Sequence, residues 1–230
     1  MSRIVKPELL DELPPADPRA VHSRRDLVRI NACMGNAAAV AVALTALGPA
    51  RSRTVLELGA GDGQFLLSVA RRLSPAWKGT AVLLLDQQPI VPPELLAAFS
   101  ELGWQAACVQ AEALAWLEQP SGPRSGVIVA NLFLHHLNEA QLRRLFCAAR
   151  ERADAVIALE PRRCRRGAFF SRLLWLIGCN AVTRHDARVS IQAGFAGQEL
   201  SQLWPDPGAW TLREQPSGSF GHLFVAHRNR

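Results

Sequence analysis

The sequence has no tyrosine among its 230 residues. Any proton transfer to or from a bound ligand therefore depends on histidine, aspartate or glutamate rather than on a phenol. The five cysteines are widely spaced and include no C-x-x-C pair, so the sequence offers no such pair for zinc or redox chemistry, and we expect no bound metal. An odd, scattered set of thiols is typical of reduced proteins, so we expect a cytoplasmic location.

Long apolar runs are absent as well. The most lipid-like stretch, residues 168–179, has about a dozen residues and is interrupted by Arg172, whereas a membrane-spanning helix needs roughly 20 apolar residues. We therefore expect no transmembrane segment, although peripheral membrane contact is compatible with this composition. The first residues, MSRIVKPELLDELPP, lack the apolar core of a secretory signal, and none is expected.

Basic residues outnumber acidic ones, which gives a formal net charge of +6 and a pI near 9.7. Much of the excess is arginine, with a dense cluster at Arg162, Arg163, Arg165 and Arg166. Such a cluster indicates a solvated face, a lid over an acidic or membrane-borne substrate, or a contact with nucleic acid. We favour the first two interpretations over nucleic acid.

Short β-rich runs alternate with helical patterns from Arg53 onward. The predicted strands are 54–58, 80–86, 105–109, 126–131 and 155–160, and the predicted helices are 64–73, 92–102, 113–117 and 139–150. Because parallel neighbours need a crossover, this alternation predicts an α/β fold with a doubly wound, mostly parallel sheet. Two final strands, 210–214 and 220–227, joined by a turn at 215–219, should complete a seven-stranded sheet as an antiparallel hairpin.

Two segments lie outside this alternation. Residues 20–47 carry apolar side chains at helical spacing and predict a helix that either packs on the sheet edge or caps a pocket. After Glu160 we expect a loop-rich insertion over the carboxyl ends of the strands, followed by a helix at 197–204. The predicted organisation is therefore a helical cap (1–50) and a main domain (51–230) with a lid insertion at about 161–190.

The predicted first strand runs into the stretch VLELGAGDGQF. A dinucleotide fingerprint would read G-x-G-x-x-G beside a pyrophosphate, but here the glycines are Gly59, Gly61 and Gly63, and Gln64 takes the position of the third fingerprint glycine. Glu57 precedes this loop, and its carboxylate would repel a diphosphate but suits a cation such as an α-ammonium group. A P-loop is disfavoured because no Gly-Lys-Ser/Thr follows.

This stretch resembles the first motif of class I S-adenosylmethionine-dependent methyltransferases, [VIL]-[VL]-[DE]-[VIL]-G-x-G-x-G, which wraps the methionine part of the cofactor. The resemblance covers roughly residues 53–160 and implies a Rossmann-like fold with S-adenosyl-L-methionine as cofactor. Asp86 ends the second strand where the family's carboxylate accepts from ribose hydroxyls, a requirement that NAD enzymes share. Glu112 stands where the family more often has the Asp that meets the adenine amino group. The cofactor-binding residues implied are Glu57, Gly59, Ala60, Gly61, Gly63, Asp86, Gln87, Glu112, Ala113 and Asn131.

The fourth strand ends in ANLFLHHL, which resembles the family's fourth motif in small-molecule methyltransferases. Asn131-Leu132-Phe133-Leu134 lacks both prolines of the [DN]-P-P-[YF] tetrad used for amino groups of adenine or glutamine, and the loop has no cysteine for pyrimidine chemistry. These absences leave a hydroxyl, an activated aromatic carbon or a small-molecule amine as the acceptor group. Among these we favour a small aromatic, phenolic or lipid-like acceptor that is methylated at oxygen. Methyl transfer needs positioning, and a base where the acceptor loses a proton. His135 and His136 are the candidates for that role, with His22, Glu160 and His185 in reserve.

The segments around residues 24–36 and 160–186 resemble uncharacterised bacterial methyltransferases associated with polyketide or lipid-like phenols. On that basis the candidate acceptor contacts are Arg29, Asn36, Arg162 and His185. Phe169, Phe170, Leu173, Leu174, Trp175, Leu176 and Ile177 would form an apolar lid, or would simply bury against the sheet. Two alternatives remain open: an RNA methyltransferase that uses the arginine cluster, and a cofactor-binding protein without catalysis. The oligomeric state is not indicated.

Overall fold

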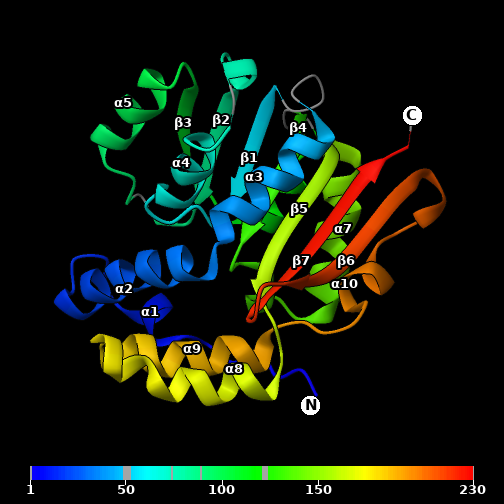
Figure 1. Cartoon of the computed structure of the whole chain (residues 1–230). Helices are drawn as coiled ribbons and strands as arrows, with labels where there is room; N and C mark the ends of the chain where they lie inside the picture. Colours follow the sequence, from blue (N-terminus) through cyan, green and yellow to red (C-terminus); the bar gives the residue numbers. More distant parts are fainter. Residues whose placement is uncertain (1, 49–52, 74, 89, 121–123, 230) are drawn as a thin grey trace.

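The computed structural model describes residues 2–48, 53–73, 75–88, 90–120 and 124–229, with only the backbone of 168–170, 172 and 173. Within these residues one seven-stranded sheet has the order β3-β2-β1-β4-β5-β7-β6, in which β7 runs antiparallel to the other six strands (Figure 1). The strands are β1 (Thr54–Leu58), β2 (Ala81–Asp86), β3 (Gln105–Gln110), β4 (Ser125–Asn131), β5 (Ala153–Pro161), β6 (Trp210–Ser217) and β7 (Gly221–Arg228). The predicted α/β class and strand set are confirmed.

Alternate residues of the central strands bury against different helical layers. Val55 belongs to the cluster that packs on α3 (Asn36–Leu47), α4 (Gln64–Ala70) and α5 (Pro93–Glu101), whereas Leu56 belongs to the opposite cluster on α6 (Ala113–Leu117), α7 (Glu139–Arg152) and α10 (Glu199–Leu203). Because a strand turns successive side chains to opposite faces, β1 and β4 need apolar residues at nearly every position. This two-sided burial holds the carboxyl ends of β1, β2 and β4 rigid.

The predicted helix over 20–47 is two helices, α2 (Pro18–Met34) and α3, that meet at an angle of 58°. Gly35 lies between them with φ 69°, a left-handed conformation that favours glycine and ends α2. Among the described residues no single helix is long and apolar enough to cross a membrane; only the bent pair of α2 and α3 passes that test together.

The insertion after β5 is helical, so the expectation of a loop-rich segment was wrong. It comprises α8 (Arg165–Phe170), the 3-10 helix η4 (Ser171–Ile177) and α9 (Ala181–Ala193). The Asn180 side chain caps α9 by accepting from the Thr183 amide at 2.8 Å. As Figure 1 shows, these helices gather with α1 (Leu9–Glu12) and α2 at the carboxyl ends of the parallel strands, where the insertion was expected.

The C-terminal hairpin is longer than predicted. Gln215, Pro216 and Ser217 were expected in the turn, but they continue β6 and pair with Leu223, His222 and Gly221. Proline is tolerated there because β6 is the edge strand, so no ladder hydrogen bond on its outer side is lost. The division into a cap and a main domain stays a prediction.

Candidate functional site

A cavity of about 540 Å³ opens at the carboxyl ends of β1, β2 and β4, beneath the helical cap. Its volume is within the range of small-molecule sites. Eleven of the predicted site residues line it: Glu57, Gly59, Ala60, Gly61, Asp86, Gln87, Glu112, Ala113, Asn131, His135 and His136. Gly63 lies outside the lining, at the N-cap of α4, where it packs against Leu84 and Leu95.

Two glycines of the loop after β1, Gly59 and Gly61, have left-handed backbone conformations but different surroundings. Gly59 has φ 67°, and a Cβ there would lie 2.5 Å from the Phe133 ring. Gly61 has φ 55°, and a Cβ there would meet nothing within 4 Å, because this residue faces the open pocket. The backbone at Gly61 is therefore exposed to any ligand in the cavity. Because Gly59 has no side chain, Phe133 of the loop after β4 can pack directly against it.

The Asp86 carboxylate fixes the shape of the glycine loop. Its Oδ2 accepts from the Gly61 amide and its Oδ1 from the Gln88 amide, both at 2.8 Å. Each carboxylate oxygen can accept more than one hydrogen bond, so both atoms retain capacity for ligand hydroxyl groups. Asp86 thus joins β1 to β2 and also presents acceptors to the pocket.

Glu57 is a buried carboxyl group with an unsatisfied oxygen. The residue is 2 % exposed, and its Oε2 has no hydrogen-bond partner among the described atoms. Burial, together with the charges of Asp62 and Asp86, raises the pKa of Glu57 well above its ordinary value. A cationic group in the pocket would supply both the missing hydrogen bond and the missing charge.

Glu112 caps the helix that follows β3. Its Oε1 accepts from the Leu114 amide at 3.0 Å and its Oε2 from the Ala115 amide at 2.6 Å, so it is the N-cap of α6. The side chain lines the pocket beside Ala113. The capping bonds hold the carboxylate in one orientation, and each oxygen keeps a second acceptor position.

Asn131 links the end of β4 to the helical cap. Its Oδ1 accepts from Asn36 Nδ2 at 3.0 Å, and Asn36 Nδ2 also donates to Asn31 Oδ1 at 2.8 Å. Asn36 is 1 % exposed and is not part of the pocket lining. The predicted acceptor contact at Asn36 is therefore placed behind the pocket wall, where it holds the junction of α2 and α3 against the sheet.

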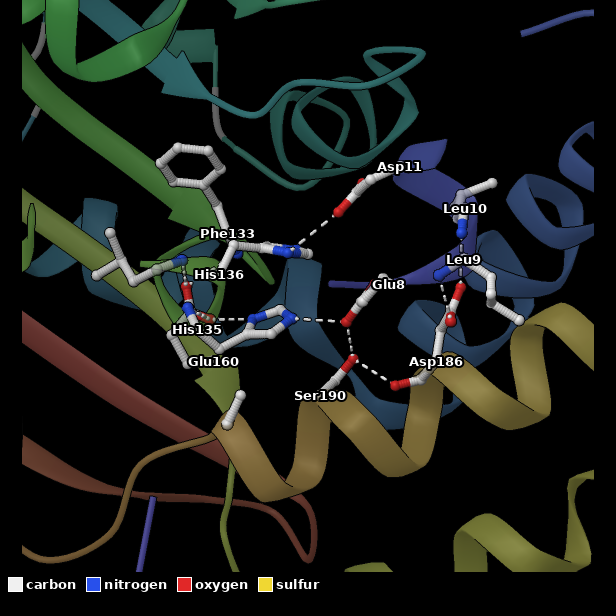
Figure 2. Close-up of polar contacts among 12 residues, drawn as sticks. Glu8, Leu9, Leu10, Asp11, Phe133, His135, His136, Glu160, Asp186 and Ser190 are labelled. Carbon is white, nitrogen blue, oxygen red and sulfur yellow. Dashed lines mark hydrogen bonds and ion pairs between the residues drawn. The ribbon is translucent and has the colours of Figure 1, made fainter. Parts of the chain in front are cut away.

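His135 lies between two carboxylates on η3 (Leu134–His136), as Figure 2 shows. Its Nδ1 is 2.8 Å from Glu160 Oε2 and its Nε2 is 3.2 Å from Glu8 Oε1. Burial alone would lower the pKa of His135, but the hydrogen bonds and charges of Glu160 and Glu8 outweigh it and raise the pKa to about 9. The ring is therefore an imidazolium at neutral pH, held by ion pairs on both sides, and cannot act as a base.

His136 has a different environment from its neighbour. Its Nδ1 is 3.4 Å from Asp11 Oδ2, and its side chain keeps 27 % exposure. Burial and the adjacent positive charge of His135 lower the pKa of His136. Burial, followed by repulsion from Glu8 and Asp186, raises the pKa of Asp11 to about 6. A neutral imidazole beside the cavity can accept a proton, so the base role fits His136 and not His135.

The ligand-capable atoms of Glu8, His135 and His136 lie within 4.8 Å of one another, close enough to share a metal ion. Both ring nitrogens of His135 are already engaged with carboxylates, which favours the charged form over a metal-binding one. The cluster is thus an ion-pair network in this structure.

An N-terminal strap, residues 3–11, completes the pocket wall and was not predicted from the sequence. Arg3 donates to the carbonyls of Ala193 (2.7 Å) and Leu137 (2.7 Å), and the Leu9 and Leu10 amides donate to Asp186 (Figure 2). These bonds join segments far apart in the chain, which no local pattern reveals. They bring Glu8 and Asp11 to the histidines.

Like Asn36, the other three predicted acceptor contacts lie outside the pocket lining. Arg29 pairs with the buried Asp26, and His185 is 2.9 Å from Asp186. Arg162 forms an isolated bridge with Phe195. In the arginine cluster, the Arg163 side chain is 6 % exposed and is paired with Glu199, so the cluster is not a uniform basic surface. That Arg29, Arg162 and His185 bind the acceptor stays a prediction.

The ion pairs of His135 with Glu160 and Glu8 predict that the stability of the fold depends on pH. Because its pKa rises from about 6.5 in the unfolded chain to about 9 on folding, the imidazolium contributes full stability below about 6.5, and that contribution is lost as the pH rises through about 9. The melting temperature should therefore fall across this interval. In the His135→Gln variant the fall should largely disappear; an unchanged slope would show that other groups cause it.

No protein-family model matches the sequence, and no curated protein sequence matches it significantly. Solved structures do match. The plantazolicin methyltransferase BamL, solved with a triazolic desmethylPZN analog and SAH, has a TM-score of 0.64 at 11 % identity, over 94 % of this chain and 93 % of that one. An O-methyltransferase family protein from Burkholderia thailandensis has a TM-score of 0.61 at 20 % identity, over 93 % of this chain and 61 % of that one.

The pyocyanin biosynthetic protein PhzM has a TM-score of 0.54 at 19 % identity, over 78 % of this chain and 51 % of that one. The match therefore spans about half the length of the pyocyanin protein. Similarity at these identities establishes the fold, and the pocket occupies the same end of the sheet where ligands bind in open α/β folds generally. The chain has the fold of the class I S-adenosylmethionine-dependent methyltransferases.

Proposed function

We propose that this protein transfers the methyl group of S-adenosyl-L-methionine to a small aromatic, phenolic or lipid-like acceptor, at oxygen. The observation that carries the proposal is the buried carboxyl of Glu57 beside the glycine loop, whose Oε2 has no hydrogen-bond partner among the described atoms. The cofactor's methionine part ends in an α-ammonium group, which provides the cation that this atom lacks. A dinucleotide pyrophosphate would instead add negative charge beside Glu57, Asp62 and Asp86.

The other pocket residues suit the remaining parts of the same cofactor. Asp86 would accept from the ribose hydroxyls, and Glu112 with the Ala113 backbone would meet the adenine edge. The open backbone of Gly61 would lie against the methionine part. The cofactor supplies an electrophilic methyl group, and the chain supplies the position and the exclusion of water.

His136 is the residue that we assign to the acceptor. It lies on the wall shared with Asp11 and the strap, its lowered pKa keeps it neutral, and it can accept the proton of a hydroxyl as the oxygen attacks. His135 would act as a positioning residue, since its charged ring holds the η3 turn between Glu160 and Glu8.

Two measurements test this proposal. Isothermal titration calorimetry with S-adenosylhomocysteine tests the cofactor, and no binding to folded protein would reject it. Transfer of labelled methyl from the cofactor to a panel of alkylphenols, fatty alcohols, amines and RNA tests the acceptor class. Label in phenols as an ether supports the proposal; label only in RNA or amines, or no transfer with any acceptor, would overturn the assignment.

Asp86→Ala should weaken S-adenosylhomocysteine binding by about 5- to 150-fold, the equivalent of roughly 1–3 kcal/mol for a buried hydrogen-bonding group. The variant loses the ribose acceptor and also the bonds that shape the loop at Gly61 and Gln88. Asp86→Asn keeps one acceptor oxygen and should show a smaller loss. Equal affinity for all three proteins in calorimetry would remove Asp86 from the site.

A further inference from the structure

The tip of η4 exposes three consecutive large apolar side chains, which we call the apolar tip. Trp175, Leu176 and Ile177 are 58, 61 and 53 % exposed. Single exposed apolar residues are ordinary on protein surfaces, whereas a contiguous group marks an interaction surface. The predicted lid over the pocket is thus turned outward at these three positions, and the alternative of burial against the sheet does not hold for them.

The apolar tip is a well-formed turn rather than a loose end. The Gly178 amide donates to the Trp175 carbonyl and the Cys179 amide to the Leu174 carbonyl, both at 3.1 Å. The residue that follows is anchored on α2, because the Asn180 amide donates to Asp26 Oδ2 at 2.9 Å. These bonds satisfy the Trp175 carbonyl and the three amides that follow the tip, which lowers the cost of moving the turn into an apolar phase.

A basic face of α2 adjoins the apolar tip. His22, Arg25 and Arg29 recur at helical spacing and are exposed, and Arg29 Nη1 is 3.5 Å from the Ile177 carbonyl. The only carboxylate of α2, Asp26, is fully buried and pairs with Arg29, whose side chain keeps 54 % exposure. The segment 162–180 contains five arginines and no acidic residue. Apolar side chains beside a basic helix face complement an anionic lipid surface.

The same helix also forms part of the pocket mouth. Arg24, Leu27 and Val28 line the cavity, and Val28 is 43 % exposed. The apolar tip, the basic face and the cavity are therefore connected through α2. An acceptor with an apolar tail could pass from a lipid layer across Val28 and Leu27 to the reacting groups without crossing open water.

We propose that the apolar tip and the basic face of α2 dock this protein on an anionic phospholipid bilayer, from which it takes a lipid-like acceptor. The docking deepens the proposed function and rests on it for the identity of the acceptor, but the surface can be tested alone. Trp175 inserts with Leu176 and Ile177 at the level of the headgroups, and Arg25 and Arg29 contact the lipid phosphates.

Tryptophan emission and vesicle sedimentation test the docking. The other five tryptophans are at most 8 % exposed, so a blue shift on adding phosphatidylglycerol vesicles reports on Trp175. The shift should be absent in Trp175→Phe and weak with phosphatidylcholine alone. In sedimentation, the triple variant Trp175→Ser, Leu176→Ser, Ile177→Ser should bind the vesicles at least about ten-fold more weakly than the wild type. Arg25→Glu should reduce both vesicle binding and the dependence of that binding on salt concentration.

Val42→Ser is the matched control, since Val42 is 70 % exposed on α3 and should leave vesicle binding unchanged. The triple variant should bind S-adenosylhomocysteine like the wild type, which shows that it is folded. Three results would overturn the docking. They are no vesicle binding by the wild type, equal binding by the triple variant, and a wild-type dimer that the triple variant does not form. Failure of the wild type to bind S-adenosylhomocysteine would instead reject the proposed function and leave the vesicle result standing.

Discussion

Glu160→Ala should lower the free energy of unfolding by about 3–5 kcal/mol, the range for removal of one partner from a buried charge pair. Glu160 is completely buried at the end of β5. Its Oε1 accepts from the amides of Phe133 (3.1 Å) and Leu134 (2.8 Å), and its Oε2 is 2.8 Å from His135 Nδ1. The substitution leaves these donors unsatisfied and the imidazolium with one remaining partner. Urea unfolding at neutral pH measures the loss.

Glu160→Gln is the informative control for that experiment. An amide has nearly the same shape and keeps one acceptor oxygen for the backbone amides, but it cannot balance the charge of His135. We expect an intermediate loss, with the pKa of His135 brought down from about 9, so the pH dependence of stability should shrink as well. If both variants unfold at the wild-type urea concentration, the η3 turn does not depend on this carboxylate.

The side of the pocket formed by the glycine loop was predictable because its determinants are local. The glycines at 59 and 61, the carboxyl of Glu57 and the strand-ending Asp86 lie within or beside strands with clear apolar runs. Parallel strands bring their carboxyl ends to the same edge of the sheet, so the sequence order already places these residues together. Their spacing along the chain was enough to predict their proximity.

The side of the pocket around His135 was not predictable, because its contacts join distant segments. Glu8 and His135 are 127 positions apart, and Asp26 and Asn180 are 154 apart. Nothing in the local pattern around His135 shows that carboxylates occupy both of its nitrogens. The sequence therefore named both histidines as candidate bases, whereas the carboxylates of Glu160 and Glu8 raise the pKa of His135 to about 9 and keep its ring protonated, so that His136 is the better candidate of the two.

The helical insertion could have been predicted from a signal that was present. Val182, Asp186, Val189 and Ala193 are buried on α9 and recur at spacings of three and four. The polar residues Thr183-Arg184-His185-Asp186 obscured this periodicity. Asp186 is buried because it receives the Leu9 and Leu10 amides of the strap, a role that makes a polar residue fit an otherwise apolar face.

Glu57→Gln should weaken S-adenosylhomocysteine binding by about 30- to 5,000-fold, corresponding to roughly 2–5 kcal/mol for loss of one partner of a buried, hydrogen-bonded charge pair. The glutamine keeps the size of the side chain but cannot balance the ammonium group of the ligand. Since Glu57 Oε2 already lacks a hydrogen-bond partner among the described atoms of the free protein, the fold itself should lose little stability. Calorimetry and thermal unfolding of the same variant separate these two effects.

Proton release provides a second, independent measure of the same contact. The raised pKa keeps the Glu57 carboxyl protonated in the free protein over a wider pH range, and an adjacent ammonium group favours its ionised form. Binding should therefore release a proton, so affinity should increase with pH and the binding enthalpy should differ between buffers of low and high ionisation enthalpy. Glu57→Gln should abolish the buffer dependence. A wild-type enthalpy that is independent of the buffer, together with unchanged affinity in the variant, would mean that the ammonium group is bound elsewhere in the pocket.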